Sequence, residues 1–396
     1  MKQIRFPAYY LPMESTTILH VANFKPNYSS NFIASIRALN RQSHALGIRH
    51  SLAFPHEARE RKWISMLQDD DIAVHFLPDP ASVTQSTRAI VRLVRLENAA
   101  IIHTHFSRQY EIEAAAARLL CGRVNLPLVW HRHSAGPTAR PLATRLKDVI
   151  GNRLLASDAT VIAVSDELRE AASQSGIAPS HVRVIENGID IGRVTRVLTP
   201  GAEMRKAWQI GEKVFTFLHF GWDPVTKGVD LVLQACKQIC RQQPSFALVI
   251  VGLKDADIRG AVGSAMPPWL RVVAPIESVG DLYAAADCML SSSRWEGFSY
   301  AVAEAMAAGL PVITTDVRGL RWAAASSGVV LVPLEPSALA SAMVAMIHST
   351  QRPAYARANR QLISQSYSVD GWASRVIRIY TELVGIVTKR RPAACP

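Results

Sequence analysis

The chain has 396 residues, of which 49% are hydrophobic and 19% charged, and its formal net charge is +12 at pH 7. This length suits two compact cores of about 150–200 residues each, and the apolar content excludes a disordered chain. Because the positive charge is shared equally by the two halves and no helix-turn-helix, zinc-finger or RNA-binding motif occurs, we expect no nucleic-acid partner.

The cysteines and the amino end indicate a cytoplasmic location. The five cysteines are odd in number and scattered, mostly in apolar stretches, which is typical of reduced thiols. Residues 1–17 lack the continuous apolar core of a signal peptide, and no run approaches eighteen apolar residues. We therefore expect a cytoplasmic protein that does not span a membrane.

Short β-branched runs alternate with amphipathic helical stretches along the first half. The expected strands are Thr17–Ala22, His50–Phe54, Ala73–Leu77, Ala100–His105, Leu126–His131 and Thr160–Ser165. This alternation predicts a parallel sheet that is covered by helices on both faces. The first domain is expected to end at residue 190, after the run Asn187-Gly188-Ile189-Asp190.

The same alternation restarts after a stretch without periodicity. Strands are expected at Val214–Phe220, Ala247–Val251, Arg271–Ala274, Cys288–Ser291, Pro311–Thr315 and Val329–Val332, with helices at about 228–241, 278–286, 299–308 and 335–348. The predicted second domain, residues 191–368, is therefore another doubly wound α/β unit. In residues 369–396, an apolar face that includes Trp372 and Tyr380 predicts a final helix that no strand follows, ahead of a basic tail.

Two carboxylates eight residues apart mark the candidate binding region. Glu296 precedes the helix expected at 299–308, and Glu304 lies within it among small apolar residues. Such a pair can accept hydrogen bonds from ligand hydroxyls, while the amides of residues 297–299 can meet an anion at the helix start. The alternative is a dipole-complementing acid and a solvated helix residue, but a solvated charge is out of place in an apolar helix.

A second candidate loop follows the first strand of the second domain. Gly221 allows a tight exit from that strand, Lys227 places a cation suited to a diphosphate at the strand end, and Gly228 is expected to let a ligand approach closely. A surface lysine beside a turn is the alternative interpretation.

These stretches, in this order, resemble glycosyltransferase family 4 of the GT-B fold. The family pattern of two glutamates separated by seven residues matches Glu296-Gly297-Phe298 and Glu304-Ala305-Met306-Ala307. Its lysine–glycine pair matches Lys227-Gly228, and its Asn-Gly-Val/Ile-Asp run matches residues 187–190. The resemblance implies two facing Rossmann-like domains, with the last helix crossing back to the first.

The resemblance also implies a role for each matching residue. The expected catalytic residues are His133, Glu296 and Lys227, with Lys227 neutralising the diphosphate of a nucleotide sugar and Glu296 binding the hydroxyls of its sugar. The expected donor-binding residues are Glu304, which would hold the ribose, and Gly297, Phe298, Ser299, Lys227, Gly221 and Asn187. The sequence departs from the family where Trp222 replaces an arginine and where residues 27–31, Asn-Tyr-Ser-Ser-Asn, replace a Gly-Gly pair. Arg196 or Arg294 is a candidate for the missing cation.

Histidines occur in two pairs at expected strand ends, His103 with His105 and His131 with His133. Alternation directs both members of a pair to one face of the sheet. The family places a histidine against the donor sugar at this point, which favours His133 and then His131; structural strand ends are the alternative. Because no carboxylate or cysteine stands nearby at ligand spacing, we expect no metal.

Two further features are assigned minor roles. Asp69-Asp70-Asp71 lies between a helix and a strand, at the wrong end of its unit for a site, and is expected to be a solvated loop. Arg88, Arg92 and Arg95 share a helix face that is either solvated or in contact with an anionic membrane surface.

The sequence therefore predicts a retaining glycosyltransferase that uses a nucleotide diphosphate sugar, with a uridine nucleotide as the first candidate. No cofactor or metal is expected, and the acceptor is expected to be a hydroxyl of a glycan, a lipid-linked sugar or a small molecule. Polysaccharide or lipid-linked oligosaccharide biosynthesis is the expected context, with attachment to the inner membrane face as an option. The alternatives are a catalytically weak scaffold of the same fold, and an epimerase or phosphorylase.

Overall fold

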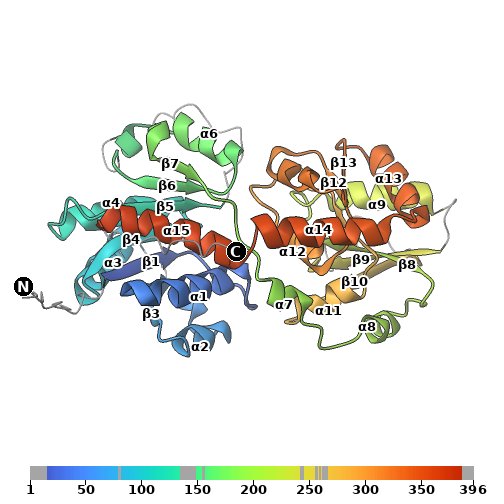
Figure 1. Ribbon diagram of the computed structural model, residues 1–396, viewed down its shortest axis with the longest axis horizontal. Helices are drawn as coiled ribbons and strands as arrows, with labels where there is room; N and C mark the ends of the chain where they lie inside the picture. The colour runs from blue at the N-terminus through green and yellow to red at the C-terminus, as the bar shows by residue number, and fades with distance from the viewer. Residues whose placement is uncertain are drawn as a thin grey trace, which may run out of the picture.

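The computed structural model describes residues 16–78, 82–133, 149–153, 157–240, 245–254, 257, 260 and 266–385. Two α/β domains lie side by side (Figure 1). The predicted architecture of two doubly wound parallel-sheet domains is confirmed. The expected basic tail at residues 386–396 lies outside the described residues.

The first domain contains a seven-stranded parallel sheet of order β3-β2-β1-β4-β5-β6-β7. Its strands are β1 Thr16–Ala22, β2 Ile48–Phe54, β3 Ala73–Phe76, β4 Ala99–His105, β5 Leu128–Arg132, β6 Thr160–Ala163 and β7 Val182–Val184. Its helices are α1 Asn31–Ser43, α2 Trp63–Gln68, α3 Val83–Leu96, α4 Arg108–Leu120 and α6 Asp166–Gln174. Strand β7 was not predicted, because three residues around a charged Arg183 are too few to show a strand pattern.

The second domain contains a six-stranded parallel sheet of order β10-β9-β8-β11-β12-β13. Its strands are β8 Phe215–Phe220, β9 Phe246–Val251, β10 Leu270–Val273, β11 Cys288–Ser291, β12 Val312–Thr315 and β13 Val329–Val332. The helices from this part of the chain are α7 Ile191–Thr195, α8 Gly201–Ala207, α9 Val229–Ile239, α11 Val279–Ala284, α12 Tyr300–Ala308, α13 Pro336–His348 and α14 Arg352–Ser366. Every predicted strand is therefore present, within two residues of its expected bounds.

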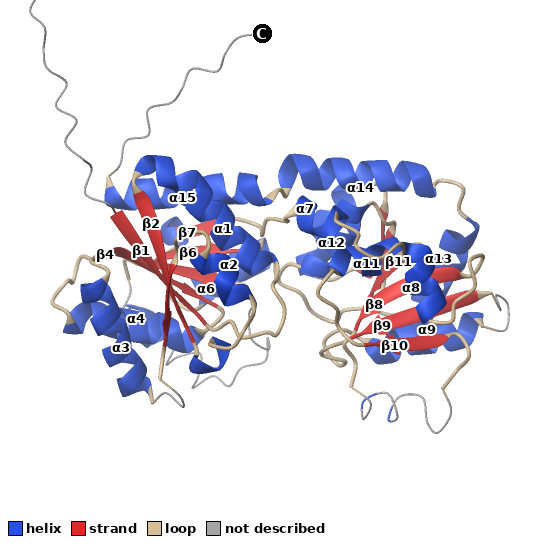
Figure 2. Cartoon of the chain, turned by 90° about the horizontal axis from the view of Figure 1, so that it is seen from below, coloured by secondary structure: helices blue, strands red, loops and turns tan. Residues whose placement is uncertain are grey.

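The last helix, α15 Val369–Val384, returns to the first domain as predicted. Helices α14 and α15 run in succession along the same side of both domains (Figure 2). Trp372 and Tyr380 of α15 are buried in one cluster with Ile33 and Ile36 of α1. Because burying one such side chain contributes about 1.5–3 kcal/mol, this contact fixes the helix on the first domain.

The chain crosses between the domains twice, and the two crossings are hydrogen-bonded to each other. The Ile189 amide donates to the Tyr367 carbonyl at 2.8 Å, and the Val369 amide donates to the Ile189 carbonyl at 3.0 Å. A Cβ at Gly188 would lie 2.7 Å from the Cβ of Trp372, so only glycine admits this approach. This contact accounts physically for the glycine of the Asn-Gly-Ile-Asp run.

Among the described residues, no helix combines the length and the apolar character that a membrane crossing requires.

Candidate functional site

Each sheet reverses its strand order at one point, and such a switch point is where ligands bind in open α/β sheets. In the second sheet the reversal lies between β8 and β11. A small pocket opens at this position. Its polar lining includes Lys227, Ser291, Ser293, Glu296 and Ser299, with Trp222 among the aromatic side chains. Three residues that the sequence marked as candidates, Lys227, Glu296 and Ser299, therefore share one pocket.

Lys227 and Glu296 form an ion pair in this pocket. The Lys227 Nζ lies 2.5 Å from Glu296 Oε1, and the Ser293 hydroxyl donates to the same oxygen at 2.8 Å. The two charged side chains are only 13% and 10% exposed. The ammonium also lies 5.0 Å from the centre of the Trp222 ring, within cation–π range. An anionic ligand entering here would compete with Glu296 for the ammonium.

Glu304 lies at the centre of a hydrogen-bond network that joins the two domains. Asn31 Nδ2 at the start of α1 donates to Glu304 Oε1 at 2.6 Å, and Arg193 Nη1 of α7 donates to the same oxygen at 2.6 Å. The Tyr283 hydroxyl donates to Oε2 at 2.8 Å. Burial, together with the Glu304 charge, raises the pKa of Tyr283, which keeps this hydroxyl a donor. The Glu304 carboxylate is therefore buried and paired with Arg193, not solvated.

The loop before α12 brings the second domain against His133. A Cβ on Gly297 would lie 2.6 Å from the His133 carbonyl oxygen, so the backbones touch directly at this glycine. Ser299 caps α12, its hydroxyl accepting from the Val302 amide at 3.4 Å. Phe298 is buried and stacks on Trp322 with ring centres 4.7 Å apart, which fixes the loop. Residues 297–299 therefore lie between the pocket and the first domain.

Gly221 and Gly228 both lie where a side chain would meet neighbouring atoms of the protein. Gly228 has φ +64°, and a Cβ there would lie 2.0 Å from the Ser292 carbonyl oxygen. A Cβ on Gly221 would lie 2.9 Å from Ile250 Cγ2. The absence of a side chain at Gly228 thus admits the chain that follows β11, and the expected approach of a ligand there stays a prediction.

At the switch point of the first sheet, between β1 and β4, histidines gather on one face. His103 and His105 of β4 and His131 of β5 are buried, and His20 of β1 and His50 of β2 join them. The predicted shared face of the paired histidines is confirmed by the stacking of His131 on His133, with ring centres 4.2 Å apart. The sequence reading missed His20 and His50, because strand order, not spacing, brings them there.

Burial controls the protonation of this cluster. It lowers the pKa of His133 to about 3, against a smaller opposing effect of hydrogen bonding to the Asn187 side chain, and it lowers the pKa of His50 to about 3. The pKa of His131 is also lowered, first by burial and then by the neighbouring histidines. The imidazoles are therefore neutral near pH 7. Asn187, 3% exposed, stands beside His133 at the end of the first domain.

Two triads of these histidines place ring nitrogens within 4.8 Å of one another, His20 with His103 and His105, and His105 with His131 and His133. A zinc ion needs nitrogen lone pairs that converge, and these lie in the ring planes. His131 and His133 stack face to face with ring centres 4.2 Å apart, so their in-plane lone pairs lie side by side, and the nearest nitrogens of His20 and His105 lie 3.0 Å apart, at hydrogen-bond distance. The expectation that no metal binds stays a prediction.

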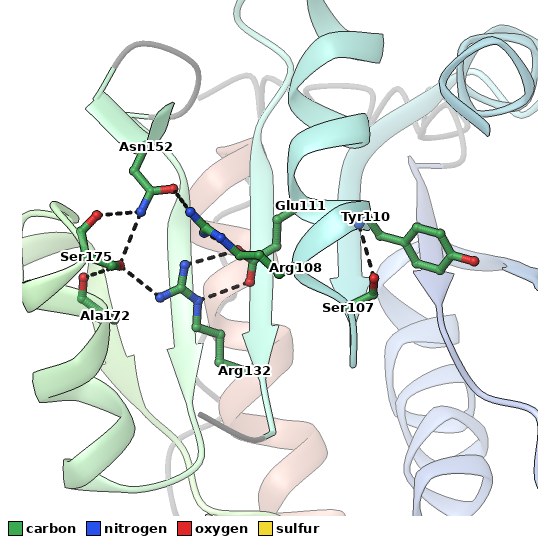
Figure 3. Close-up of polar contacts among 8 residues, drawn as sticks. All are labelled: Ser107, Arg108, Tyr110, Glu111, Arg132, Asn152, Ala172 and Ser175. Atoms are coloured by element: carbon green, nitrogen blue, oxygen red, sulfur yellow. Dashed lines mark hydrogen bonds and ion pairs between the residues drawn. The ribbon is translucent and has the colours of Figure 1, made fainter. Parts of the chain in front are cut away.

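A polar network on the opposite side of β5 holds the strand end that carries His133. Arg132 follows His131 in β5, so the two side chains project to opposite faces of the sheet. Arg132 contacts Glu111 of α4 through Nε at 3.1 Å and Nη2 at 3.0 Å (Figure 3). Arg108 donates to the same carboxylate at 2.6 Å and Ser175 accepts from Arg132 at 3.2 Å. Two guanidinium groups thus clamp one buried carboxylate and fix the course of β5 beside the site.

One arginine of this region that the sequence analysis missed is Arg193, which pairs with Glu304. Arg294 is paired with Asp230 at 2.7 Å on the exposed side of its loop. Arg196 is exposed and makes no contact that the structure records with the pocket. Arg193 instead reaches Glu304, and its other terminal nitrogen donates to the Ser29 carbonyl at 3.1 Å. The signal in the sequence that could have identified Arg193 is its position three residues after Asp190, at the end of the Asn-Gly-Ile-Asp run.

The aspartate run 69–71 ends α2, as expected of a loop far from the pocket. One correction applies: Asp70 is not simply solvated, because Arg37 binds it in a bidentate pair at 2.6 and 3.0 Å. This pair lowers the pKa of Asp70.

Comparison with known proteins matches both domains. The family model Glycosyltransferase Family 4 matches residues 34–193, and the model Glycosyl transferases group 1 matches residues 214–349. A D-inositol 3-phosphate glycosyltransferase of Xylanimonas cellulosilytica is 26% identical over 317 residues, covering 74% of this chain and 73% of that protein. A GDP-mannose:cellobiosyl-diphosphopolyprenol alpha-mannosyltransferase of Xanthomonas oryzae pv. oryzae is 31% identical over 179 residues, or 43% of each chain.

Solved structures share the fold. Anabaena Alr3699/HepE in complex with UDP and glucose has a TM-score of 0.75 at 19% identity, covering 92% of this chain and 99% of that chain. A glycosyltransferase from Rickettsia africae has a TM-score of 0.76 at 16% identity, covering 94% and 100%. The expected GT-B arrangement of two Rossmann-like domains is therefore confirmed.

Proposed function

This chain belongs to glycosyltransferase family 4, and we propose that it transfers a sugar from a nucleotide diphosphate sugar to a hydroxyl group of its acceptor, with retention at the anomeric carbon. The observation that carries the proposal is the pairing of Lys227 with Glu296 in a pocket at the switch point of the second sheet. A buried cation and a buried carboxylate here match the two needs of such a donor, neutralisation of a diphosphate and recognition of neutral hydroxyls.

In this proposal the donor exchanges contacts already present in the protein. The diphosphate takes the Lys227 ammonium, which releases Glu296 to accept hydrogen bonds from sugar hydroxyls. The ribose hydroxyls donate to Glu304 in place of Asn31, while Arg193 remains the neighbouring cation. Lys227 and Arg193 supply the positive charge that the Trp222 substitution removes, and no metal is required for the diphosphate.

The transfer step makes the bond between the acceptor oxygen and the anomeric carbon and breaks the bond from that carbon to the diphosphate. The acceptor proton passes to the leaving diphosphate oxygen, and Lys227 stabilises the charge that develops there. Retention through attack on the donor's own face suits a site without a carboxylate assigned as nucleophile, since this proposal assigns Glu296 to the sugar hydroxyls and Ser293 also donates to it. His133 would contact the sugar from the first domain.

UDP is the proposed nucleotide, and thermal-shift measurements with UDP, GDP, ADP and dTDP, each with and without EDTA, test it. A ligand at a hundred times its dissociation constant stabilises the fold by about 2.7 kcal/mol. A shift with UDP alone that EDTA does not change supports the proposal. A thermal shift with GDP alone would mean that the donor carries guanine rather than uracil. A shift that EDTA abolishes would overturn the proposal that the site works without a metal.

A catalytically weak scaffold is the second candidate, favoured by one observation. Trp222 stands 50% exposed at the pocket where the family has arginine. Mass spectrometry of nucleotide sugars incubated with the protein distinguishes the two: an enzyme releases nucleoside diphosphate, by transfer or by slow hydrolysis, whereas a scaffold leaves the donor intact.

We also propose that α3 and the end of α4 bind an anionic membrane surface, where a lipid-linked acceptor of polysaccharide synthesis would be available. Arg88, Arg92 and Arg95 are exposed on α3, beside Leu96 at 71% exposure and Leu120 of α4 at 65%. Cationic and apolar groups together are what an interfacial helix presents.

Flotation with vesicles of phosphatidylglycerol and phosphatidylcholine tests the membrane proposal. The variant R88E/R92E/R95E is expected to lose binding, at about 1 kcal/mol for each arginine, whereas R357E on the exposed side of α14 retains it. Equal flotation of both variants would contradict this surface.

A further inference from the structure

Four imidazoles, one on each of β2, β1 and β4 and one directly after β5, form a continuous series of hydrogen bonds. His50 Nδ1 lies 2.9 Å from His20 Nε2, and His20 Nδ1 lies 3.0 Å from His105 Nε2. His105 Nδ1 lies 3.5 Å from Nε2 of His133, the longest link. At the far end, His50 Nε2 lies 2.8 Å from the Ser43 hydroxyl, at the end of α1. The strand order β2-β1-β4-β5 sets this sequence of contacts.

The rings of this chain meet edge to edge rather than face to face. The ring centres are 5.1 Å apart for His20 and His50, 5.3 Å for His20 and His105, and 5.8 Å for His105 and His133. Each value exceeds the matching nitrogen–nitrogen distance by nearly the same amount, about 2.2–2.3 Å. In-plane hydrogen bonds between imidazoles have this geometry, unlike the face-stacked pair of His131 and His133.

Ser43 gives the chain a direction. Its hydroxyl has one proton, and its oxygen lies 2.7 Å from the Leu39 carbonyl, which can only accept. With the proton directed to Leu39, the Ser43 oxygen accepts from His50, so His50 carries its proton on Nε2. A neutral imidazole has one donor and one acceptor, so His50 Nδ1 must accept from His20.

The same rule passes from ring to ring. His20 donates through Nε2 and accepts at Nδ1, His105 does likewise, and His133 donates through Nε2 to His105. The reverse assignment at His133 would set two lone pairs against each other across the link between His105 Nδ1 and His133 Nε2. Burial lowers the pKa of every ring in the chain, so the neutral forms assumed here are the ones present near pH 7.

We propose that Ser43 sets the tautomer of His133 through His50, His20 and His105, so that His133 offers Nδ1 as a hydrogen-bond acceptor. These four are positioning residues for His133. Resting on the proposed transfer function, the expected partner of Nδ1 is a hydroxyl of the bound sugar or acceptor, reached when the loop of Gly297, which touches His133, adjusts to the ligand.

Nitrogen-15 NMR of the imidazole rings tests the tautomers directly. In the full chain labelled at histidine, two- and three-bond proton–nitrogen correlations distinguish Nε2–H from Nδ1–H, and single His→Gln variants assign the signals. The expected result is Nε2–H for His20, His50, His105 and His133. An Nδ1–H form at any of the four in the unmodified protein overturns the proposal, whatever the variants do.

Removing the hydroxyl tests its control over the chain. In Ser43→Ala the direction set by Leu39 is lost. The donors and acceptors along the series of imidazoles are then expected to reverse, with Nδ1–H at His133. Ser35→Ala is the matched control, since Ser35 is another buried serine of α1 whose hydroxyl makes no hydrogen bond in the structure. An unchanged pattern in Ser43→Ala, or the same change in Ser35→Ala, contradicts the proposal.

Kinetics separate this inference from the proposed function. Loss of one neutral hydrogen bond predicts a roughly three- to tenfold lower kcat/KM for Ser43→Ala, with Ser35→Ala unchanged. If the tautomers agree but no donor is consumed by the unmodified protein, the proposed function fails while the tautomer assignment stands. If transfer occurs and Ser43→Ala keeps full kcat/KM despite a reversed chain, the role of Nδ1 toward the substrate is wrong.

Discussion

The two switch points occupy equivalent places in two similar sheets, yet they hold opposite kinds of chemistry. In the second domain charges are paired: Lys227 with Glu296 in the pocket, and Arg193 of α7 with Glu304 of α12. In the first domain the same position is filled by imidazoles that burial keeps neutral, linked from His50 to His133. The charged side can exchange partners with an ionic ligand, whereas the neutral side can only fix the orientation of a donor or acceptor. A shared topology therefore decides where a ligand binds, and the side chains decide what each domain contributes.

The largest expected difference between the two domains is the loss of stability in acid. At its switch point the first domain gathers six histidines: His20, His50, His103, His105 and His131, which are buried, and His133, which is partly buried. Their folded pKa values lie below the unfolded value of about 6.5, so the unfolded chain binds more protons in acid. The stability that they contribute is present above pH 6.5 and is lost as the pH falls from 6.5 toward 3. Each contributes a loss of roughly 1 kcal/mol per pH unit.

Hydrogen exchange followed by mass spectrometry at pH 7 and pH 5, corrected for intrinsic rates, measures this difference by domain. Peptides of β1, β4 and β5 should lose protection, and those of β8 and β11 should keep it, because the second sheet buries one pocket histidine, His219, whose pKa burial lowers to about 4. Equal loss in both domains would show that the histidines do not control acid stability.

Removing the Trp372 side chain, which joins the histidines of the first domain to the crossing helix α15, is expected to lower stability nearly as much. Trp372 is buried, packs on His131 with ring centres 6.0 Å apart, and lies against Gly188. Trp372→Ala should lower the free energy of unfolding by about 3–5 kcal/mol, because it leaves a large cavity. Urea denaturation measures it, with Trp222→Ala, whose side chain is half exposed, as the control with a much smaller loss.

On the charged side, Lys227→Ala should reduce turnover most. Loss of the cation that meets the leaving diphosphate predicts about a hundredfold to thousandfold lower kcat. Lys237→Ala, on the exposed face of the following helix α9, should retain activity. Assays at saturating donor measure it, with unfolding monitored because Glu296 loses its partner. Full turnover in a folded Lys227→Ala protein would contradict the proposed role of Lys227 in binding the diphosphate.

Glu304→Gln is a smaller change, since it keeps the shape of the side chain and removes its charge. Charge-assisted hydrogen bonds are worth about 1.5–3 kcal/mol, so the dissociation constant for the nucleotide should rise roughly ten- to hundredfold. Isothermal titration calorimetry with UDP measures it, and exposed Glu335→Gln is the control. Unchanged affinity would mean that Glu304 only joins Asn31 and Arg193 across the domains.

The sequence alone determined the fold class and every strand except the short β7, because the pattern of a strand or helix lies in contiguous residues. The buried runs of β1 and β8, the Ser299 cap and the Gly309 stop of α12, and the apolar stripe of α15 all depend on local periodicity and local hydrogen bonding. The spacing of Glu296 and Glu304 also follows from one loop and one helix. These features needed no knowledge of which strands are neighbours.

The tertiary structure alone decided which distant side chains meet. His20 and His105 are 85 positions apart, and Asn31 and Glu304 are 273 apart, so no local pattern links them. Strand order joined the histidines, and the packing of two domains placed Arg193, not Arg196 or Arg294, against Glu304. The physical reason is that propensity and periodicity act along the chain, whereas hydrogen bonds and ion pairs act through space once the sheets are assembled.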